Sequence, residues 1–237
     1  MKNIYTKRQV RFVVMVAILI FSYALAVNIN NLTQFTSNNQ NIVSDDKSLA
    51  INKLGELAVR ERVSSEGYSR ERFAPGWESY DGCDVRNRIL KRDLDDVKID
   101  SDNDCYVLSG VLDVCPFTGK RIEFVRGPDT SGDIHIEHIV ALSDAWQKGA
   151  QDLNKEERRL FFNDYLNLIA VDGPANIEKG DKDASDWLPW EPYRCKYIAR
   201  QIAIKYRYDL WVTESEHDAM KRVLQTCPSQ QLPKIGD

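Results

Sequence analysis

The sequence predicts an α+β fold in which two short strands and a short helix lie at the centre of a mainly helical domain. Residues 133–140 (DIHIEHIV) are rich in β-branched side chains, and the alternation through 134–138 suits a strand. Residues 166–171 (LNLIAV) form a second strand-like run. The turn signal Asp172-Gly173 follows, and Pro174 then suits the first residue of a helix that Gly180 would end.

The N-terminus has the pattern of an export signal. Basic residues precede an uncharged run of sixteen residues, Phe12–Val27, which is shorter than the roughly 20 needed to span a bilayer. Ala24-Leu25-Ala26 is a small-x-small cleavage pattern. We therefore expect residues 1–26 to be a cleaved signal peptide, with an uncleaved membrane anchor as the alternative. Either places the rest of the chain outside the cytoplasm, secreted or extracytoplasmic.

The remaining chain divides into a leader and one domain. Residues 27–65 are expected to form a flexible spacer, rich in Asn, Ser, Thr and Gln up to residue 47, and then an amphipathic helix over 48–63. Residues 66–237 have the length and composition of one globular domain.

Short signals predict the elements of this domain in order. A helix is expected to begin in residues 85–94, and residues 105–125 suggest a β-hairpin. The piece between the two central strands, residues 141–163, is expected to be helical, with one cap at Ser143-Asp144 and a capping box from Asn154 to Glu157. Trp146 within it is expected to have a core or hinge role, with stacking on a nucleic-acid base as the alternative. Helices are also predicted over 193–208 and from Thr213 to Leu224.

Polar residues of a catalytic kind gather in the central unit. Two of the three histidines lie within residues 133–140, and Glu137 stands next to His138, so the two side chains point to opposite sides of an extended strand. Asn167 and Asn176 follow nine residues apart. Asn176 and Lys179 would share one face of the short helix. A zinc peptidase would need His-Glu-x-x-His on a helix, which this His-x-Glu-His strand does not provide.

This strand–strand–helix pattern resembles the HNH endonucleases, whose fold is also called the ββα-metal finger. The neighbouring text, EHIVAL, NLIAV and NIEKGD, is most similar to their secreted bacterial branch with a GmrSD-like C-terminal nuclease domain. The resemblance implies that His138 is the general base. It also implies that Asn167 holds the finger together and orients the His138 side chain. It also implies that Glu137 and Asn176 bind a divalent metal, Mg²⁺ first, with Mn²⁺ or Ca²⁺ as alternatives. The chain departs from the family pattern in two ways. Glu137 stands where many relatives have Asp, and about 28 residues separate His138 from Asn167, more than in the smallest fingers.

The resemblance implies an exported endonuclease that hydrolyses phosphodiester bonds of DNA, and RNA as a second possibility, with little sequence preference. The expected partner is nucleic acid, with no protein partner and no stable membrane partner once the signal is cleaved. Lys179, Lys182 and Arg86 are candidate substrate contacts, each with an ordinary structural alternative. His135 has no assigned role. The competing interpretation is a catalytically inactive nucleic-acid or surface-binding module on the same fold.

Cysteine content agrees with export. The chain has five cysteines and no CxxC pair, so a zinc knuckle is not supported. Two disulfides are expected in an oxidising compartment. Four cysteines allow three pairings, and the resemblance implies Cys83–Cys105 and Cys195–Cys227, which leaves Cys115 over.

Net charge limits the mode of substrate binding. The full chain carries −4, and residues 1–26 hold four basic and no acidic residues, so the exported part is more negative still. Tight sequence-specific DNA binding needs an extensive basic surface. The balance therefore favours loose binding in a local basic groove. The helix over 193–208 offers candidate positions for such a groove: Arg194, Lys196, Arg200, Lys205 and Arg207.

Overall fold

The computed structural model describes residues 49–233. The predicted signal segment and most of the predicted spacer lie outside these residues. In the described part of the chain, no helix has the length and apolar character needed to cross a membrane. The predicted α+β class is confirmed by the strands and helices below.

The largest sheet has three antiparallel strands in the order β3 (Asp95–Asp100), β4 (Asn103–Leu112), β5 (Ile122–Val125). The predicted hairpin is therefore confirmed as β4–β5. Strand β3 was not predicted, because its side chains are acidic or only partly buried and show no apolar alternation. A two-residue hairpin, β1 (Ser79–Tyr80) and β2 (Cys83–Asp84), comes before this sheet.

Helix α3 (Val85–Asp93) begins directly after the N-cap residue Asp84. The Asp84 side chain accepts a hydrogen bond from the Asn87 backbone N–H, which satisfies one of the free donors of the first turn. Ile89 and Leu90 are completely buried. Since α3 contacts β4, β6 and β7, it joins the three-stranded sheet to the central unit.

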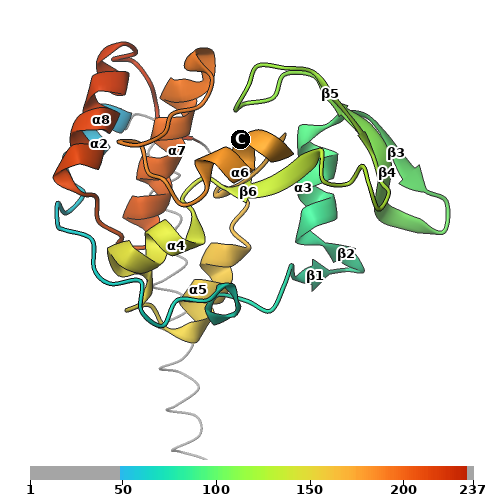
Figure 1. Cartoon of the computed structure of the whole chain (residues 1–237), viewed down its shortest axis with the longest axis horizontal. Coiled ribbons are helices and arrows are strands. Elements are labelled where there is room, and N and C mark those ends of the chain that lie inside the picture. Colours follow the sequence, from blue (N-terminus) through green and yellow to red (C-terminus); the bar gives the residue numbers. More distant parts are fainter. Residues whose placement is uncertain (1–48, 234–237) are drawn as a thin grey trace, which may run out of the picture. The chain divides into compact units, whose positions relative to one another are not determined.

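The central unit is an antiparallel pair, β6 (Ile134–His138) and β7 (Leu168–Asp172), followed directly by α6 (Gly173–Lys179). We call these three elements the finger. Asp172 caps α6 by accepting the Ala175 N–H, and Gly180 ends it with a positive φ of 53°. Figure 1 shows the finger between the β3–β5 sheet, in green, and the orange and red helices.

The helical side consists of α7 (Arg194–Arg207), α8 (Glu214–Gln225) and the short α2 (Ala50–Leu54), which contact one another (Figure 1). The insertion between the finger strands contains α4 (Leu142–Ala145), a distorted turn, η2 (Trp146–Ala150), and α5 (Lys155–Phe162). Two 3₁₀ turns complete the described elements, η1 (Arg70–Arg72) and η3 (Glu191–Tyr193).

Several local predictions are confirmed. Both ends of the predicted capping box form, with Asn154 accepting from the backbone and Glu157 returning a bond to the Asn154 N–H. Trp146 is buried and packs edge-on against Phe73. The two disulfides are Cys83–Cys105 and Cys195–Cys227, as the resemblance implied, and Cys115 is a buried free thiol.

Other local predictions are wrong. The predicted helix over 48–63 ends at Leu54, and Val59 beyond it pairs with Val212 as an isolated bridge. Helix α4 starts at Leu142 without a side-chain cap, so Ser143-Asp144 do not cap it. Arg200 and Lys205 of α7 were expected on a basic surface, yet both are buried.

Arg200 and Lys205 are buried because each has partners inside the protein. The Arg200 guanidinium donates to the carbonyl oxygens of Leu166 and Leu168 at the start of β7. Lys205 joins Lys148, Asp144, Asp183 and Glu216 in a buried ion cluster, in which Lys148 Nζ lies 2.6–2.7 Å from three carboxylate oxygens. We call this set of five residues the Lys148 cluster. It ties α4, η2, α7 and α8 together beside the finger.

Candidate active site

Strand β6 sends its side chains to two faces, as the alternation in its sequence predicts. Ile134, Ile136 and His138 are buried, whereas His135 and Glu137 are partly exposed. His135 and Glu137 therefore face the same side, and α6 lies over that side of the strand. The predicted opposite placement of Glu137 and His138 is confirmed.

Asn176 and Lys179 lie one helical turn apart on α6. Each of them contacts one of the two partly exposed residues of β6. Asn176 Nδ2 lies 3.2 Å from His135 Nδ1, and Lys179 Nζ lies 2.8 Å from Glu137 Oε1. The spacing of three residues on the helix thus matches the spacing of two on the strand. The sequence indicated that Asn176 and Lys179 share a face, and the structure confirms it.

One atom of this group lacks a partner. Within residues 49–233, Asn176 Oδ1 is buried and accepts no hydrogen bond. A buried amide oxygen without a partner costs roughly 1–3 kcal/mol, so native proteins seldom leave one. Glu137 uses Oε1 for Lys179, and its other oxygen makes no hydrogen bond to the described residues. Two oxygen atoms that could bind a metal ion, one on β6 and one on α6, therefore make no hydrogen bond to the described residues.

His138 lies on the buried face of β6 and is only 3% exposed. Its Nε2 donates to the Phe162 carbonyl oxygen at 2.8 Å, and its ring stacks on Trp77 with an interplanar angle of 14°. A proton on Nε2 leaves the lone pair on Nδ1, which makes no hydrogen bond within the described residues. The pKa of His138 is lowered to about 3, mainly by burial; the bond to Phe162 opposes this, and the positive charges of Arg70 and Lys179 add to it.

Arg70 and Trp77 cover the His138 side of the finger. The exposed Arg70 guanidinium lies 5.6 Å from the Trp77 ring centroid and 4.7 Å from that of Phe162. An arginine over aromatic rings next to a histidine is a suitable phosphate contact. Sequence reasoning assigned no role to either residue, because only the tertiary fold brings residues 70 and 77 to the finger.

Asn167 is buried just before β7 and serves as a clamp. Its Oδ1 accepts the Val140 N–H at 2.8 Å and its Nδ2 donates to the Val140 carbonyl at 3.3 Å. The Asn167 carbonyl also accepts the Ile139 N–H at 2.7 Å. These bonds hold the end of β6, directly after His138, against β7. Asn167 acts on the backbone and not on the His138 ring.

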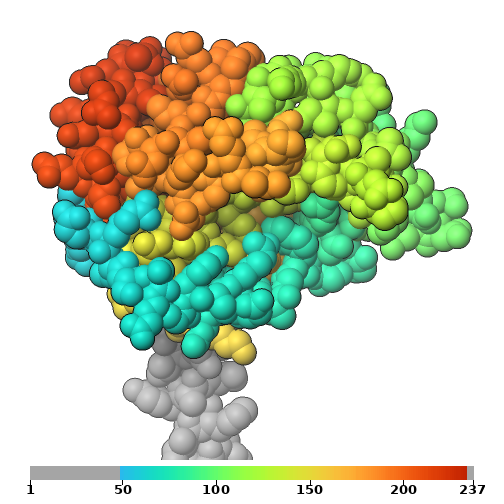
Figure 2. All heavy atoms as spheres, in the orientation of Figure 1, coloured from blue at the N-terminus to red at the C-terminus, as the bar shows by residue number. Residues whose placement is uncertain are grey.

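The remaining predicted contacts lie as follows. Lys179 is fully buried against Glu137 and presents no free surface, whereas the exposed Lys182 donates to the Glu178 carbonyl. Arg86 donates to the carbonyl oxygens of Ser131 and Ile134, at the entry to β6. Figure 2 shows the surface hollowed between the orange region that contains α6 and the teal segment that precedes α3.

Comparison with known proteins gives the chain its family. Residues 84–223 match the model of GmrSD restriction endonucleases, C-terminal domain. The chain belongs to this family. A secreted protein of Arthroderma benhamiae, described as uncharacterized, is 36% identical over 184 residues, covering 76% of this chain and 85% of the relative. No solved structure matches the chain.

The family match confirms the predicted resemblance and indicates nuclease-type activity for a domain that includes the whole finger. The secreted relative and the two disulfides agree with an extracellular setting. The roles of individual finger residues stay predictions.

Metal binding can be judged from the donors on the finger. Among residues 49–233, no three His, Cys, Asp or Glu side chains gather closely enough to hold an ion. Glu137 and Asn176 instead offer one carboxylate and one unpartnered amide oxygen. Hard ions such as Mg²⁺ take oxygen ligands and keep several waters, so one or two protein donors suffice. The free donors therefore fit such an ion.

Proposed function

We propose that this protein is an exported, metal-dependent endonuclease that hydrolyses phosphodiester bonds of DNA with little sequence preference. The observation that carries the proposal is Asn176 Oδ1, which is buried and has no partner among the described residues, on the face of α6 that meets Glu137, the strand residue directly before His138. The family's nuclease character supports the reaction class. Export is supported by the two disulfides and by the secreted relative.

His138 is the proposed general base. With Nε2 bound to the Phe162 carbonyl, its ring is fixed and Nδ1 is free to take a proton from the attacking water. Stacking on Trp77 holds the plane of the ring. Its low pKa keeps the imidazole neutral in the free protein, and the negative charge of a bound phosphodiester would raise that pKa toward the working pH.

Glu137 and Asn176 would hold a divalent ion, Mg²⁺ first, whose charge stabilises the phosphate oxygens during displacement. Arg70, whose charge acts on the His138 ring, would add a second positive charge at the phosphate. Asn167 is a positioning residue, because its clamp on Val140 fixes the strand end that carries His138. The fit of Mn²⁺ or Ca²⁺ follows from the same oxygen donors.

One observation favours the alternative of an inactive binding module. The fully buried Lys179 already neutralises Glu137 at 2.8 Å, which leaves this carboxylate less charge to offer an ion. A finger that retained its shape but not its metal would show this arrangement. The alternative predicts nucleic-acid binding without turnover.

Plasmid nicking separates the two functions. The protein is produced by secretion, so that its disulfides form, and is incubated with supercoiled DNA in Mg²⁺, in Mn²⁺ and in chelator. We expect nicking only with metal, and a decrease of roughly 10²- to 10⁴-fold for His138→Ala. His217→Ala, which changes a histidine in the first turn of α8, is the matched control and should cut like the parent.

Each contrary outcome has a definite meaning. Intact plasmid under every metal, with a folded protein, would overturn the nuclease proposal in favour of the binding module. Nicking that survives His138→Ala would remove His138 as the base and turn attention to His135. Asn176→Ala and Glu137→Gln should still require metal. Both should need a higher metal concentration than the parent to reach the same rate of nicking.

A further inference from the structure

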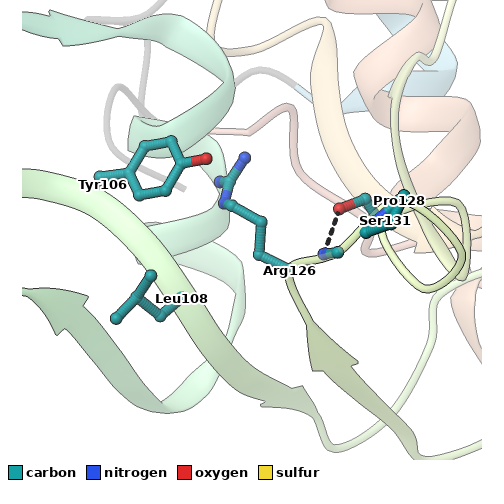
Figure 3. A pocket seen from close by; sticks show the side chains of 6 residues that line it. Tyr106, Leu108, Arg126, Pro128 and Ser131 are labelled. Carbon is teal, nitrogen blue, oxygen red and sulfur yellow. Dashed lines mark hydrogen bonds between the residues drawn. The ribbon is translucent and has the colours of Figure 1, made fainter.

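An open pocket lies where the loop after β5 crosses the outer face of β4. Its volume is about 500 Å³. Strand β4 contributes an aromatic and an aliphatic side chain, and the loop contributes an arginine and small residues (Figure 3). The lining residues are Tyr106, Leu108, Arg126, Gly127, Pro128 and Ser131.

The floor of the pocket is formed by an aromatic and an aliphatic side chain. Tyr106 is 39% exposed and Leu108 is 38% exposed, although both are large apolar groups. The Arg126 guanidinium lies 4.2 Å from the Tyr106 ring centroid. Its Nε donates to the Val107 carbonyl at 2.6 Å and its Nη2 to Asn87 Oδ1 at 2.7 Å, so the guanidinium is held in place.

The positive charge at this pocket comes from one lining arginine and from a second arginine that donates to the lining residue Ser131. Arg126 and the neighbouring Arg86 bond to neutral oxygens, and neither forms an ion pair in the part of the chain that the structure describes. Burial lowers the pKa of Arg86, and the positive charge of Arg126 lowers it further, whereas the negative charge of Asp84 raises it. Two like charges in a partly buried place are unfavourable, and an anion would relieve them.

The pocket is tied to the finger through one loop. Ser131 lines the pocket, its carbonyl accepts from Arg86, and it lies four residues before His135. Four residues span at most about 14 Å, so the two sites are a few nucleotides apart. The Gly132 carbonyl leaves no room for a side chain on Gly173 of α6, so this loop is packed against the finger.

We propose that this pocket binds one unpaired nucleotide of single-stranded DNA, with its base on Tyr106 and Leu108 and its phosphate at Arg126 and Arg86. The inference rests on the proposed nuclease function and names the form of its substrate. A base inside a duplex has both faces covered by its neighbours, so only an unpaired base can stack on Tyr106. The protein should therefore prefer single-stranded DNA near the cleavage position.

DNA binding without cleavage tests this. The full-length His138→Ala protein in chelator is titrated into a fluorescently labelled oligothymidine, and the Kd is read from anisotropy. Adding Tyr106→Ala should weaken binding roughly 5- to 150-fold, the effect of losing one stacked base. Tyr106→Phe should retain it. Tyr165→Ala, which removes a tyrosine that is also 39% exposed, is the control and should bind like the parent.

A duplex of the same length distinguishes pairing states. We expect it to bind more weakly than the single strand and to be insensitive to Tyr106→Ala. An unchanged Kd in Tyr106→Ala, an equal loss in Tyr165→Ala, or an equal loss for the duplex would each overturn the proposal. Because no cleavage is needed, these results stand apart from the nicking assay, in which the nuclease function itself succeeds or fails.

Discussion

The burial of His138 should make the free energy of unfolding of the metal-free protein depend on pH. An unfolded histidine has a pKa of about 6.5, whereas that of His138 in the folded protein is about 3. Between these values the unfolded chain binds one proton more than the folded chain. Stability therefore rises with pH in this window and is lost as the pH falls from 6.5 toward 3.

The size of the effect follows from the same two values. The slope reaches about 1.4 kcal/mol per pH unit, and between pH 7 and pH 5 the integrated loss is about 2 kcal/mol. This interval lies above the ordinary pKa range of Asp and Glu, and the buried Glu216, whose pKa burial raises, is the same in the variant compared below. A group that is 3% exposed is also poorly screened by solvent, so most of the loss should be observed.

Urea unfolding at pH 7 and pH 5, in chelator and with disulfides intact, measures the loss directly. His138→Gln is the comparison, because Gln does not titrate and can still donate to the Phe162 carbonyl. The parent should lose about 2 kcal/mol more than this variant. His135 and His217 are present in both proteins, so their contributions cancel in the difference. Equal losses would refute the reasoning, because they would mean that folded His138 accepts a proton as easily as the unfolded residue.

Three other perturbations test the scaffold. Lys148→Met removes the ammonium that contacts three buried carboxylates and should cost about 3–5 kcal/mol of unfolding free energy in urea; a loss under 1 kcal/mol would show that water reaches the cluster. Asn167→Ala leaves the Val140 N–H and carbonyl unpaired and should cost about 2–4 kcal/mol, measured by calorimetry, whereas a neutral change would exclude the clamp. Replacing Cys83 and Cys105 together by Ser should lower the free energy of unfolding by about 3 kcal/mol, because a loop with a sequence separation of 22 is released. The midpoint of thermal unfolding should fall accordingly.

Local signals predicted the finger well because its geometry is set by short-range periodicity. The alternation of residues 134–138 sent Glu137 and His138 to opposite faces, and a spacing of three put Asn176 and Lys179 on one face of α6. Gly180 ends α6 as predicted, whereas Asp172, predicted only as part of a turn, is the N-cap and starts the helix one residue before Pro174.

Features that depend on distant partners could not be predicted in this way. Lys205 has the charge of a surface residue, and only the approach of α4 and α8 gives it buried carboxylate partners. The pairing of His135 with Asn176 needs the register of β6 against β7 and the placement of α6, so His135 received no role from sequence alone. Strand β3 was missed because it is held by backbone bonds to β4 and not by an apolar face.

The free Cys115 thiol gives the protein a built-in reporter of local opening. Its sulfur is fully buried and accepts the Asp172 N–H at 3.3 Å, from the same residue that caps α6. An alkylating reagent can reach this sulfur only when the segment that carries Cys115 and the finger residue Asp172 separate. The rate of thiol labelling would thus measure how often the finger opens in the native protein, with no dye attached and with the four disulfide-bonded cysteines silent.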